Sequence, residues 1–280
     1  MSECLDLRVP ADWSDAAARI TEEDVRRVMV LGAADVGKST LCRFLSQKVD
    51  ATGRSAALLD ADVGQKTVGP PACVTLVEGN RSKLVFVGTT DPVQDWRRVV
   101  GGTRVLANAL GPSLTIVNTG GLVGGPGRRL KADMIAAIRP DLMIVIGGGS
   151  DLDHIIANHP NVSALRLTRS PDARRNAKAA RRSARQEAFR KYFEGAAVRV
   201  FSCGLVPEAL HHRLGTGVLV GLSDRPGTDL GLGILLGEPR SSMLEVLAHL
   251  ADGDIRQVTP GSVRLREDFS ELRSRLQEQL

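Results

Sequence analysis

The sequence predicts an α/β protein: a parallel sheet with helices on both faces, an arginine-rich helical lid and a small β-rich C-terminal domain. Up to residue 167, short apolar runs alternate with segments of helical periodicity, the pattern of a parallel sheet with helical connections. A glycine-rich turn, GAADVGKST at residues 32–40, joins the first run to a helix. From residue 196, short apolar runs are separated by Gly, Pro and Asp. We therefore expect one domain over residues 1–195, including a lid near 169–193, and a second over 196–280.

The elements of the first half follow in order. After a lead-in over residues 1–26, whose Trp13 and Ala16–Ile20 we expect to pack on the core, strand, helix and strand are predicted at 28–31, 38–47 and 56–60. Apolar runs at 73–78 and 83–87 flank the turn at 79–81 and predict a hairpin. A helix near 93–110 follows, with Thr90 or Asp91 as its cap.

Further strands are predicted at 114–118, 142–146 and 165–167, with a helix near 129–138 between the first two. Residues 172–193 predict one helix, the lid. Alanines recur there at spacings of three and four and should share its buried face: Ala173, Ala177, Ala180, Ala184 and Ala188. Because alanine buries little area, we expect this helix to be loosely held and to move, with Tyr192 and Phe193 as a firmer anchor. Short strands at 198–201, 217–222, 231–236 and 263–265 complete the chain, before a charged helix or frayed tail at 268–280.

The turn at residues 32–40 fits the phosphate-binding pattern G-x-x-x-x-G-K-[ST] and lies between a strand and a helix, where that pattern acts. Its glycines let backbone N–H groups wrap a phosphate, and the helix N-terminus adds its positive end. Lys38 can reach the β- and γ-phosphates of ATP, and the Ser39 hydroxyl can ligate Mg²⁺. The expected nucleotide-binding residues are Gly32, Ala33, Ala34, Asp35, Val36, Gly37, Lys38, Ser39 and Thr40.

Composition narrows the class of protein. Hydrophobic residues make up 42% of the chain but aromatic ones only 3%, so Ala, Val, Leu and Ile must build the core. No apolar run approaches the roughly 18 residues of a membrane span, and the start lacks the pattern of a secretory signal, so we expect neither. The cysteines Cys4, Cys42, Cys73 and Cys203 are far apart, which favours reduced thiols in a cytoplasmic protein. His211-His212 lacks metal-ligand spacing and is expected at the surface.

Positive charge is concentrated in one segment. Residues 169–191 carry nine basic and two acidic side chains, a formal charge of +7, although the net charge of the chain is only +5. A cationic element beside a nucleotide site suits a polyanionic ligand or a phosphoryl transition state. A solvated charged helix is the alternative interpretation.

The loop DADVGQ at residues 60–65, after the second strand, adds carboxylates. Ligands of open α/β sheets collect at the carboxyl ends of strands, where this loop begins. Phosphoryl transfer to an alcohol needs a carboxylate near the attacking hydroxyl and further help in holding Mg²⁺. Asp60 and Asp62 can divide these tasks, although a capping role competes for Asp60 alone.

With these motifs in order, the sequence resembles the polynucleotide 5′-hydroxyl kinases related to the cleavage-and-polyadenylation RNA kinase and the nucleolar pre-ribosomal RNA kinase. The resemblance covers nearly the whole chain. It departs at Leu122, where the family commonly has tryptophan, and at Asn176, where an arginine is expected. The matching segments are DVGKST at 35–40, DADVGQ at 60–65, GTTDP at 88–92, NTGG at 118–121, the arginine-rich segment ending at 192–195, and GVLVGLSD at 217–224.

The resemblance implies a kinase that uses ATP and Mg²⁺ to phosphorylate the 5′-hydroxyl end of a polynucleotide, with RNA favoured over DNA. It implies that Lys38 and Ser39 serve the ATP phosphates and Mg²⁺, that Asp60 supports the metal and that Asp62 is the base near the hydroxyl. The residues implied on the nucleic-acid side are Gln65, Thr89, Thr90 and Leu122. Arg181, with Arg182 or Arg185, would neutralise charge on the transferring phosphoryl group. The sequence identifies no protein partner.

Two other functions stay open at this stage. One is a nucleotide-dependent switch that slowly hydrolyses ATP or GTP, although no N-K-x-D guanine-recognition motif is present. The other is a small-molecule kinase, favoured by the few aromatic residues and disfavoured by the +7 segment. A requirement of nucleotide turnover for a 5′-hydroxyl acceptor would separate the polynucleotide kinase from the switch.

Overall fold

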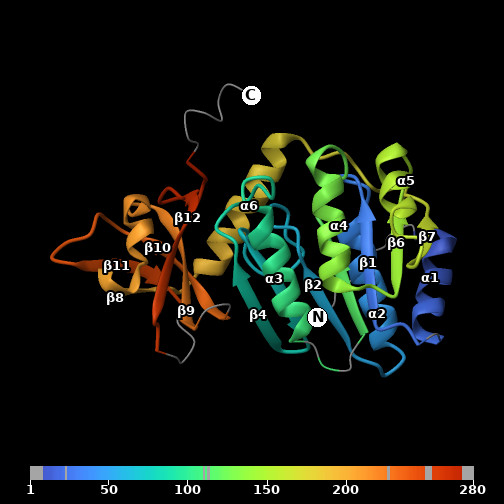
Figure 1. Ribbon diagram of the computed structural model, residues 1–280, viewed down its shortest axis with the longest axis horizontal. Coiled ribbons are helices and arrows are strands. Elements are labelled where there is room, and N and C mark those ends of the chain that lie inside the picture. Colours follow the sequence, from blue (N-terminus) through green and yellow to red (C-terminus); the bar gives the residue numbers. More distant parts are fainter. Residues whose placement is uncertain are drawn as a thin grey trace. The chain divides into compact units, whose positions relative to one another are not determined.

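The computed structural model describes residues 9–22, 24–109, 111, 114–225, 228–249 and 254–272. The chain forms two compact units, whose elements Figure 1 labels. Unit 1 comprises Met1–Ala61, Val77–Arg81 and Ala107–Asn176, and unit 2 comprises Asp62–Leu76, Ser82–Leu106 and Ala177–Leu280. The chain therefore changes unit inside the DADVGQ loop and again at residue 177. Each unit combines segments that are far apart in the sequence, so this division does not test the predicted domain boundary after residue 195. The domains 1–195 and 196–280 therefore stay a prediction.

Unit 1 contains the predicted parallel sheet, in the order β2-β5-β1-β6-β7. The crossover from β1 to β2 runs one way across the sheet and that from β5 to β6 runs the other way. Because such crossovers are right-handed, α2 and α4 cover opposite faces (Figure 1). The elements are α1 (Ala11–Glu22), β1 (Arg27–Gly32), α2 (Lys38–Asp50), β2 (Ala56–Asp60), β5 (Leu114–Asn118), α4 (Pro126–Ile138), β6 (Leu142–Ile146), α5 (Ser150–Ala157) and β7 (Ser163–Leu167).

The strands of unit 1 are buried because their sequences are continuous apolar runs. Every residue of β5 and β6 is buried, as a sheet covered on both faces requires. The lead-in packs on this core as expected: Trp13 of α1 is 1% exposed, and its indole N–H donates to the carbonyl of Thr168 at 2.9 Å. Sequence reasoning missed α5, because a helix of eight residues after three glycines carries little periodicity.

Unit 2 is mainly antiparallel. β12, β9, β10 and β4 lie in that order, β10 also pairs with β11, and β11 with β8. β3 and β4 are neighbours joined by the tight turn at Gly79-Asn80, which confirms the hairpin. The elements that lie wholly or mostly in unit 2 are β3 (Cys73–Glu78), β4 (Arg81–Phe86), α3 (Trp96–Asn108), α6 (Lys178–Phe193), β8 (Ala197–Ser202), the 3₁₀ turns η1 (Cys203–Leu205) and η2 (Glu208–Arg213), β9 (Val218–Arg225), β10 (Thr228–Leu235), β11 (Met243–Ala248) and β12 (Gln257–Arg264).

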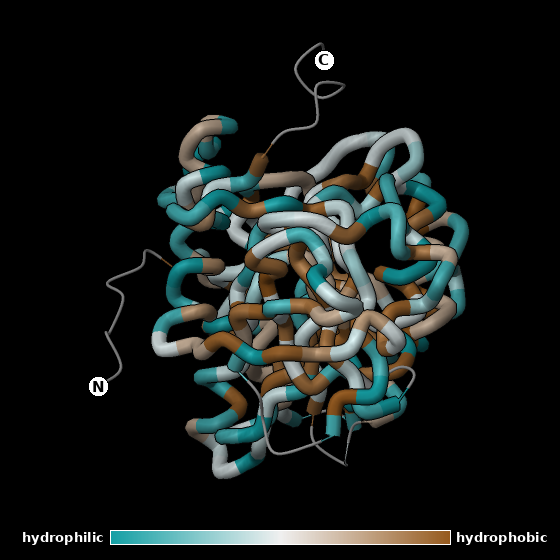
Figure 2. Tube along the Cα trace, turned by 90° about the vertical axis from the view of Figure 1, so that its left-hand side faces the viewer, coloured by the Kyte–Doolittle hydropathy of each residue, from teal (hydrophilic) through white to brown (hydrophobic). Residues whose placement is uncertain are grey.

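Two apolar clusters form the core of unit 2. One joins Phe86 to Phe189, Phe193 and Leu232, and the other lies under β9 and β11. The apolar stretches, brown in Figure 2, lie mostly in the interior of the trace. Sequence reasoning missed β11, whose apolar residues alternate with exposed ones such as Glu245. Residues 268–272 of the predicted tail are not helical, and residues 273–280 lie outside the described part.

The lid prediction needs two corrections. Its helix, α6, begins at Lys178, so residues 172–177 precede it without helical structure. The buried face is also different: Ala180 and Ala184 are exposed, whereas Phe189 and Phe193 are buried. A phenylalanine buries far more apolar area than an alanine, so the aromatic residues determine which side of the helix faces the core. Arg181 and Arg185, eight and four residues before Phe189, consequently lie half-buried on that side.

The described cysteines are free. Cys42 and Cys73 are buried and Cys203 is half-buried, while Cys4 lies outside the described residues. Burial raises the pKa of the Cys42 and Cys73 thiols far above the ordinary range, so both stay protonated. Among the described residues, no helix has the length and apolar character that crossing a bilayer requires.

Candidate active site

The phosphate-binding loop of unit 1 connects β1 to α2. Gly37, the N-cap of α2, has a φ of 98°, in the left-handed region that favours glycine. Because glycine has no capping side chain, the N–H groups of the first turn of α2 are left to the loop or to a ligand. The backbone therefore has the form that a phosphate cradle needs.

Lys38 points into this loop. Its side chain is 7% exposed, and its Nζ donates to the carbonyl oxygen of Ala33 at 2.6 Å. The ammonium is thus held over the loop, where it can exchange this contact for a phosphate oxygen. Ser39, the next residue, is half-buried in the first turn of α2.

Asp60 and Asn118 lie side by side at the carboxyl ends of β2 and β5. They face each other in the parallel register, and Asn118 Nδ2 donates to Asp60 Oδ1 at 3.0 Å. Asp60 is fully buried, so its carboxylate must be held by polar partners rather than by water. Since β1 runs parallel to β5, its carboxyl end, where the phosphate-binding loop begins, lies at the same edge of the sheet.

The loop after β5 presses against the phosphate-binding loop. A Cβ on Gly121 would lie 2.5 Å from the backbone nitrogen of Ala34, so only glycine fits. Thr119 Oγ1 donates to the carbonyl of Val30 at 2.8 Å, and Lys131 Nζ donates to that of Gly120 at 2.7 Å. Sequence reasoning missed Lys131, a fully buried lysine on the apolar face of α4. Its place in that apolar stripe was the available indication.

Asn176, the departure noted in the sequence, contacts the phosphate-binding loop. Its backbone N–H and its side-chain Nδ2 each donate to the Asp35 carboxylate at 3.2 Å. Asp35 itself adopts a φ of 61°. Asn176, two residues before α6, is therefore fastened to the phosphate-binding loop, and an asparagine suits that contact.

In unit 2, Asp62 organises the rest of the DADVGQ loop. Its Oδ1 accepts from the N–H groups of Gly64 at 3.0 Å and Gln65 at 2.9 Å. Gln65 Nε2 donates to the carbonyl of Arg181 at 3.3 Å, which joins the loop to α6. A Cβ on Gly64 would lie 2.8 Å from the carbonyl oxygen of Thr90, so the loop also packs tightly against the GTTDP segment.

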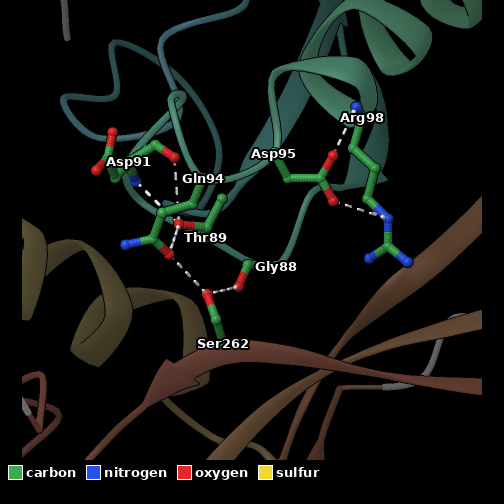
Figure 3. A network of polar contacts seen from close by, with 7 residues as sticks. All are labelled: Gly88, Thr89, Asp91, Gln94, Asp95, Arg98 and Ser262. Atoms are coloured by element: carbon green, nitrogen blue, oxygen red, sulfur yellow. Dashed lines mark hydrogen bonds and ion pairs between the residues drawn. The ribbon is translucent and has the colours of Figure 1, made fainter. Parts of the chain in front are cut away.

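Figure 3 shows how the GTTDP segment is fixed to β12. Thr89 is 4% exposed, and its hydroxyl lies 3.0 Å from Gln94 Oε1 and accepts from Asp91 N–H at 3.1 Å. Ser262 of β12 donates to the carbonyl of Gly88 at 3.1 Å and to Gln94 Oε1 at 3.3 Å. Thr89 is thus committed to holding the loop together, whereas Thr90 is half-buried and lines a pocket.

This pocket, which we call the α6 pocket, has a volume of about 500 Å³ and lies within unit 2. Its lining includes Thr90, the basic side chains Lys178, Arg181, Arg182 and Arg185 of α6, and Glu271. Arg185 forms a bidentate pair with Glu271, Nε to Oε1 at 2.9 Å and Nη2 to Oε2 at 2.7 Å. Sequence reasoning missed Glu271, because no local pattern relates it to a residue 86 positions earlier.

The sequence-predicted site residues thus fall into two groups. Unit 1 holds the phosphate-binding loop from Gly32 to Thr40, Asp60 and Leu122, the last half-buried beside Gly127. Unit 2 holds the others: Asp62, Gln65, Thr89, Thr90, Arg181, Arg182 and Arg185. Each unit gathers its own group, one around a phosphate cradle and the other around a basic pocket.

Comparison with known proteins identifies the family of the chain. The family described as mRNA cleavage and polyadenylation factor CLP1 P-loop matches residues 32–195. The chain is 28% identical to a polyribonucleotide 5′-hydroxyl-kinase of Pyrococcus furiosus, over 94% of this chain and 95% of the relative. It is 31% identical to one of Pyrococcus horikoshii, over 69% of this chain and 57% of the relative. Clp1p, solved in complex with a segment of Pcf11p, shares the fold with a TM-score of 0.73 at 13% identity, over 92% of this chain and 80% of that chain.

Proposed function

The chain belongs to the CLP1 P-loop family, and we propose that it is a polynucleotide 5′-hydroxyl kinase that uses ATP and favours RNA over DNA as the acceptor. The observation that carries the proposal is that one chain holds both a phosphate cradle, in unit 1, and a carboxylate loop joined to an arginine-bearing helix, in unit 2. The curated relatives named as polyribonucleotide 5′-hydroxyl-kinases support the same activity.

Unit 1 would bind the nucleotide. The N–H groups at the start of α2 would hold the phosphates, and Lys38 would leave the Ala33 carbonyl for the β- and γ-phosphates. For Mg²⁺, the available protein ligands are oxygens: the Ser39 hydroxyl and the buried Asp60 carboxylate. They fit an ion that usually takes one or two protein ligands and completes its shell with phosphates and water. The ion would offset negative charge that develops on the phosphates.

Unit 2 would hold the acceptor. Asp62 would accept the proton of the 5′-hydroxyl, and its position is fixed by the two N–H groups that it caps. Gln65, Thr89, Thr90 and, from unit 1, Leu122 would lie on the nucleic-acid side. Arg181, with Arg182 or Arg185, would offset charge on the transferring phosphoryl group. A cytoplasmic location stays a prediction.

The direct test uses γ-labelled ATP with RNA and DNA oligonucleotides of one sequence that carry a 5′-hydroxyl. We expect label at the 5′ end of both, at a higher kcat/KM for RNA. The same oligonucleotides with a 5′-phosphate should take up none, because the acceptor oxygen is blocked. Equal ATP hydrolysis with and without the 5′-hydroxyl strand, and no labelled product, would contradict the proposal.

A further inference from the structure

Lys131 is a buried charged group of unit 1 to which the proposed function gives no role. It lies in the second turn of α4, and its side chain is fully buried on the apolar face of that helix. Taking an ammonium group out of water costs free energy, which burial of a methionine of similar length would not. The packing of α4 alone therefore does not account for a lysine at this position.

The ammonium group of Lys131 fixes the loop that follows β5 (residues 119–121). Its Nζ donates to the carbonyl oxygen of Gly120 at 2.7 Å. The next helix after β5 is α4, so its N-terminus lies near the carboxyl edge of the parallel sheet, one face of which it covers (Figure 1). Side chains of a helix lean toward its N-terminus, so Lys131 reaches toward the edge of the sheet where the phosphate-binding loop begins.

The loop after β5 is held on both sides of Gly120. Before it, Thr119 Oγ1 donates to the carbonyl of Val30, which fixes the start of the loop beside β1. After it, the backbone of Gly121 packs against the phosphate-binding loop, where a Cβ at Gly121 would lie 2.5 Å from the nitrogen of Ala34. The lysine contact lies between these two points and therefore sets how closely the two loops approach each other.

We propose that Lys131 is a positioning residue for the nucleotide. Its hydrogen bond to Gly120 holds the loop after β5 against the phosphate-binding loop and so keeps the phosphate-binding loop in the shape that binds phosphate. This inference rests on the proposed function, in which the phosphate-binding loop takes ATP. Lys131 acts through Gly120 and not by contact with the nucleotide, unlike Lys38, which points into the phosphate-binding loop.

Lys131→Met keeps the apolar stem of the side chain and removes its donor. We expect the Kd for ATP, measured by isothermal titration calorimetry, to rise about tenfold, because the loop loses a charge-assisted hydrogen bond. The Kd for ADP should rise by the same factor, since the loop after β5 contacts Ala34 rather than the γ-phosphate. Lys38→Ala should weaken ATP binding more than ADP binding, because Lys38 would meet the γ-phosphate. In RNA labelling, Lys131→Met should raise the KM for ATP and leave kcat within about twofold of wild type.

Stability without nucleotide separates a positioning residue from a structural one. Gly120 is half-buried, so its carbonyl can bond to water when the lysine is absent. We therefore expect Lys131→Met to unfold at the same urea concentration as wild type or at a higher one. Arg129→Met removes the same charge from an exposed position of α4; it is the matched control and should leave the Kd for ATP unchanged.

A double-mutant cycle tests the route through the loop. Gly121→Ala forces the same loop away from Ala34. Because both changes would act on one contact, the variant that carries both should bind ATP no more weakly than the weaker-binding single variant. Independent effects would instead multiply, to a loss of about a hundredfold.

Three results would overturn the inference: a Lys131→Met protein that binds ATP as tightly as wild type, multiplied losses in the double variant, or a Lys131→Met protein that fails to fold or is clearly less stable, which would show a structural role. The binding measurements need no acceptor. Wild-type protein that binds ATP but phosphorylates no RNA would therefore overturn the proposed function, while the Kd values would still decide the role of Lys131. Wild-type protein that binds no ATP would overturn both.

Discussion

The two units hold their candidate residues by different means. In unit 1, the candidate residues are positioned mainly by the backbone. The parallel strands end at one edge of the sheet, a loop follows each strand, and Gly121 allows one loop to pack closely against another. In unit 2, they are positioned mainly by hydrogen bonds of side chains: Asp62 caps its own loop, Ser262 binds the GTTDP segment, and Glu271 binds Arg185. A site built on backbone geometry leaves a local motif in the sequence, whereas one built on distant side-chain pairs does not.

The largest expected effect is loss of nucleotide chemistry from unit 1. Lys38→Ala should reduce labelling of a 5′-hydroxyl oligonucleotide by roughly a thousandfold or more, because it removes the cation that meets the β- and γ-phosphates. Lys48→Ala, which removes an exposed lysine from the same helix, is the matched control and should label normally. If Lys38→Ala kept wild-type labelling, unit 1 would not be the nucleotide unit.

In unit 2, Asp62→Asn should lower kcat by roughly 10²–10⁴-fold while ATP affinity stays unchanged. The amide oxygen can still accept from Gly64 and Gln65, so the loop keeps its shape and only the base is lost. Glu208→Gln, an exposed change in η2, controls for the loss of a carboxylate. Single-turnover labelling and equilibrium ATP binding are the measurements. Normal labelling would exclude Asp62 as the base.

Two glycine substitutions test whether the units divide nucleotide from acceptor. Gly121→Ala forces the loop after β5 away from Ala34 and should weaken ATP binding about tenfold. Gly64→Ala forces its loop away from Thr90 and should raise the acceptor KM by about the same factor. Gly148→Ala, with no atom within 4 Å of the added Cβ, should change neither. Equal effects of both variants on one parameter would contradict the division of labour.

A smaller effect concerns the dependence of stability on pH in unit 2. Burial raises the pKa of Asp229 above its ordinary value of 3.8, although Ser223 and the N–H of Phe86 bond to it. The folded state therefore keeps this proton to a higher pH than the unfolded chain, and stability falls as pH rises from 3.8 through the raised pKa. Asp229→Asn should remove this slope. The measurement is the free energy of unfolding of the wild-type and Asp229→Asn proteins at a series of pH values. A difference between the two free energies that does not change with pH would contradict this prediction.

The smallest predicted effect separates stability from activity. Gly101 lies in α3 with open space around it, so Gly101→Ala should stabilise the protein by about 0.5–1 kcal/mol without changing kcat. At the adjacent Gly102 a Cβ would lie 3.0 Å from Val85, so Gly102→Ala should destabilise instead. The melting temperatures of the two variants, each compared with wild type, measure these effects. Shifts of the same sign would contradict the difference in packing between Gly101 and Gly102.

Much of unit 1 could be predicted from the sequence. The strands at 56–60, 114–118 and 142–146 have the predicted bounds, because buried parallel strands are uninterrupted apolar runs between polar loops. The phosphate-binding loop could likewise be predicted, because its conformation requires glycines at fixed positions of the sequence. The role of Lys131 was not predicted. It depends on a hydrogen bond to a carbonyl eleven residues earlier in the chain, which helical periodicity does not indicate.

Unit 2 was predicted less completely. The arginines of α6 were identified from their density, but the alanine pattern gave the wrong buried face, because Phe189 and Phe193 outweigh it. Glu271 and Ser262 act through residues 86 and 168 or more positions away, so their roles exist only in the folded chain. Long-range polar pairs of this kind have no sequence period by which to recognise them.

The central claim is that nucleotide turnover by this chain depends on a terminal alcohol. The most direct measurement is the rate of ADP release with ATP and Mg²⁺, alone and with saturating 5′-hydroxyl RNA, beside the rate of RNA labelling. The account predicts slow release alone and a large increase with RNA, matched one for one by labelled 5′ ends. ADP release that is equally fast without RNA, or an increase without labelled ends, would contradict it.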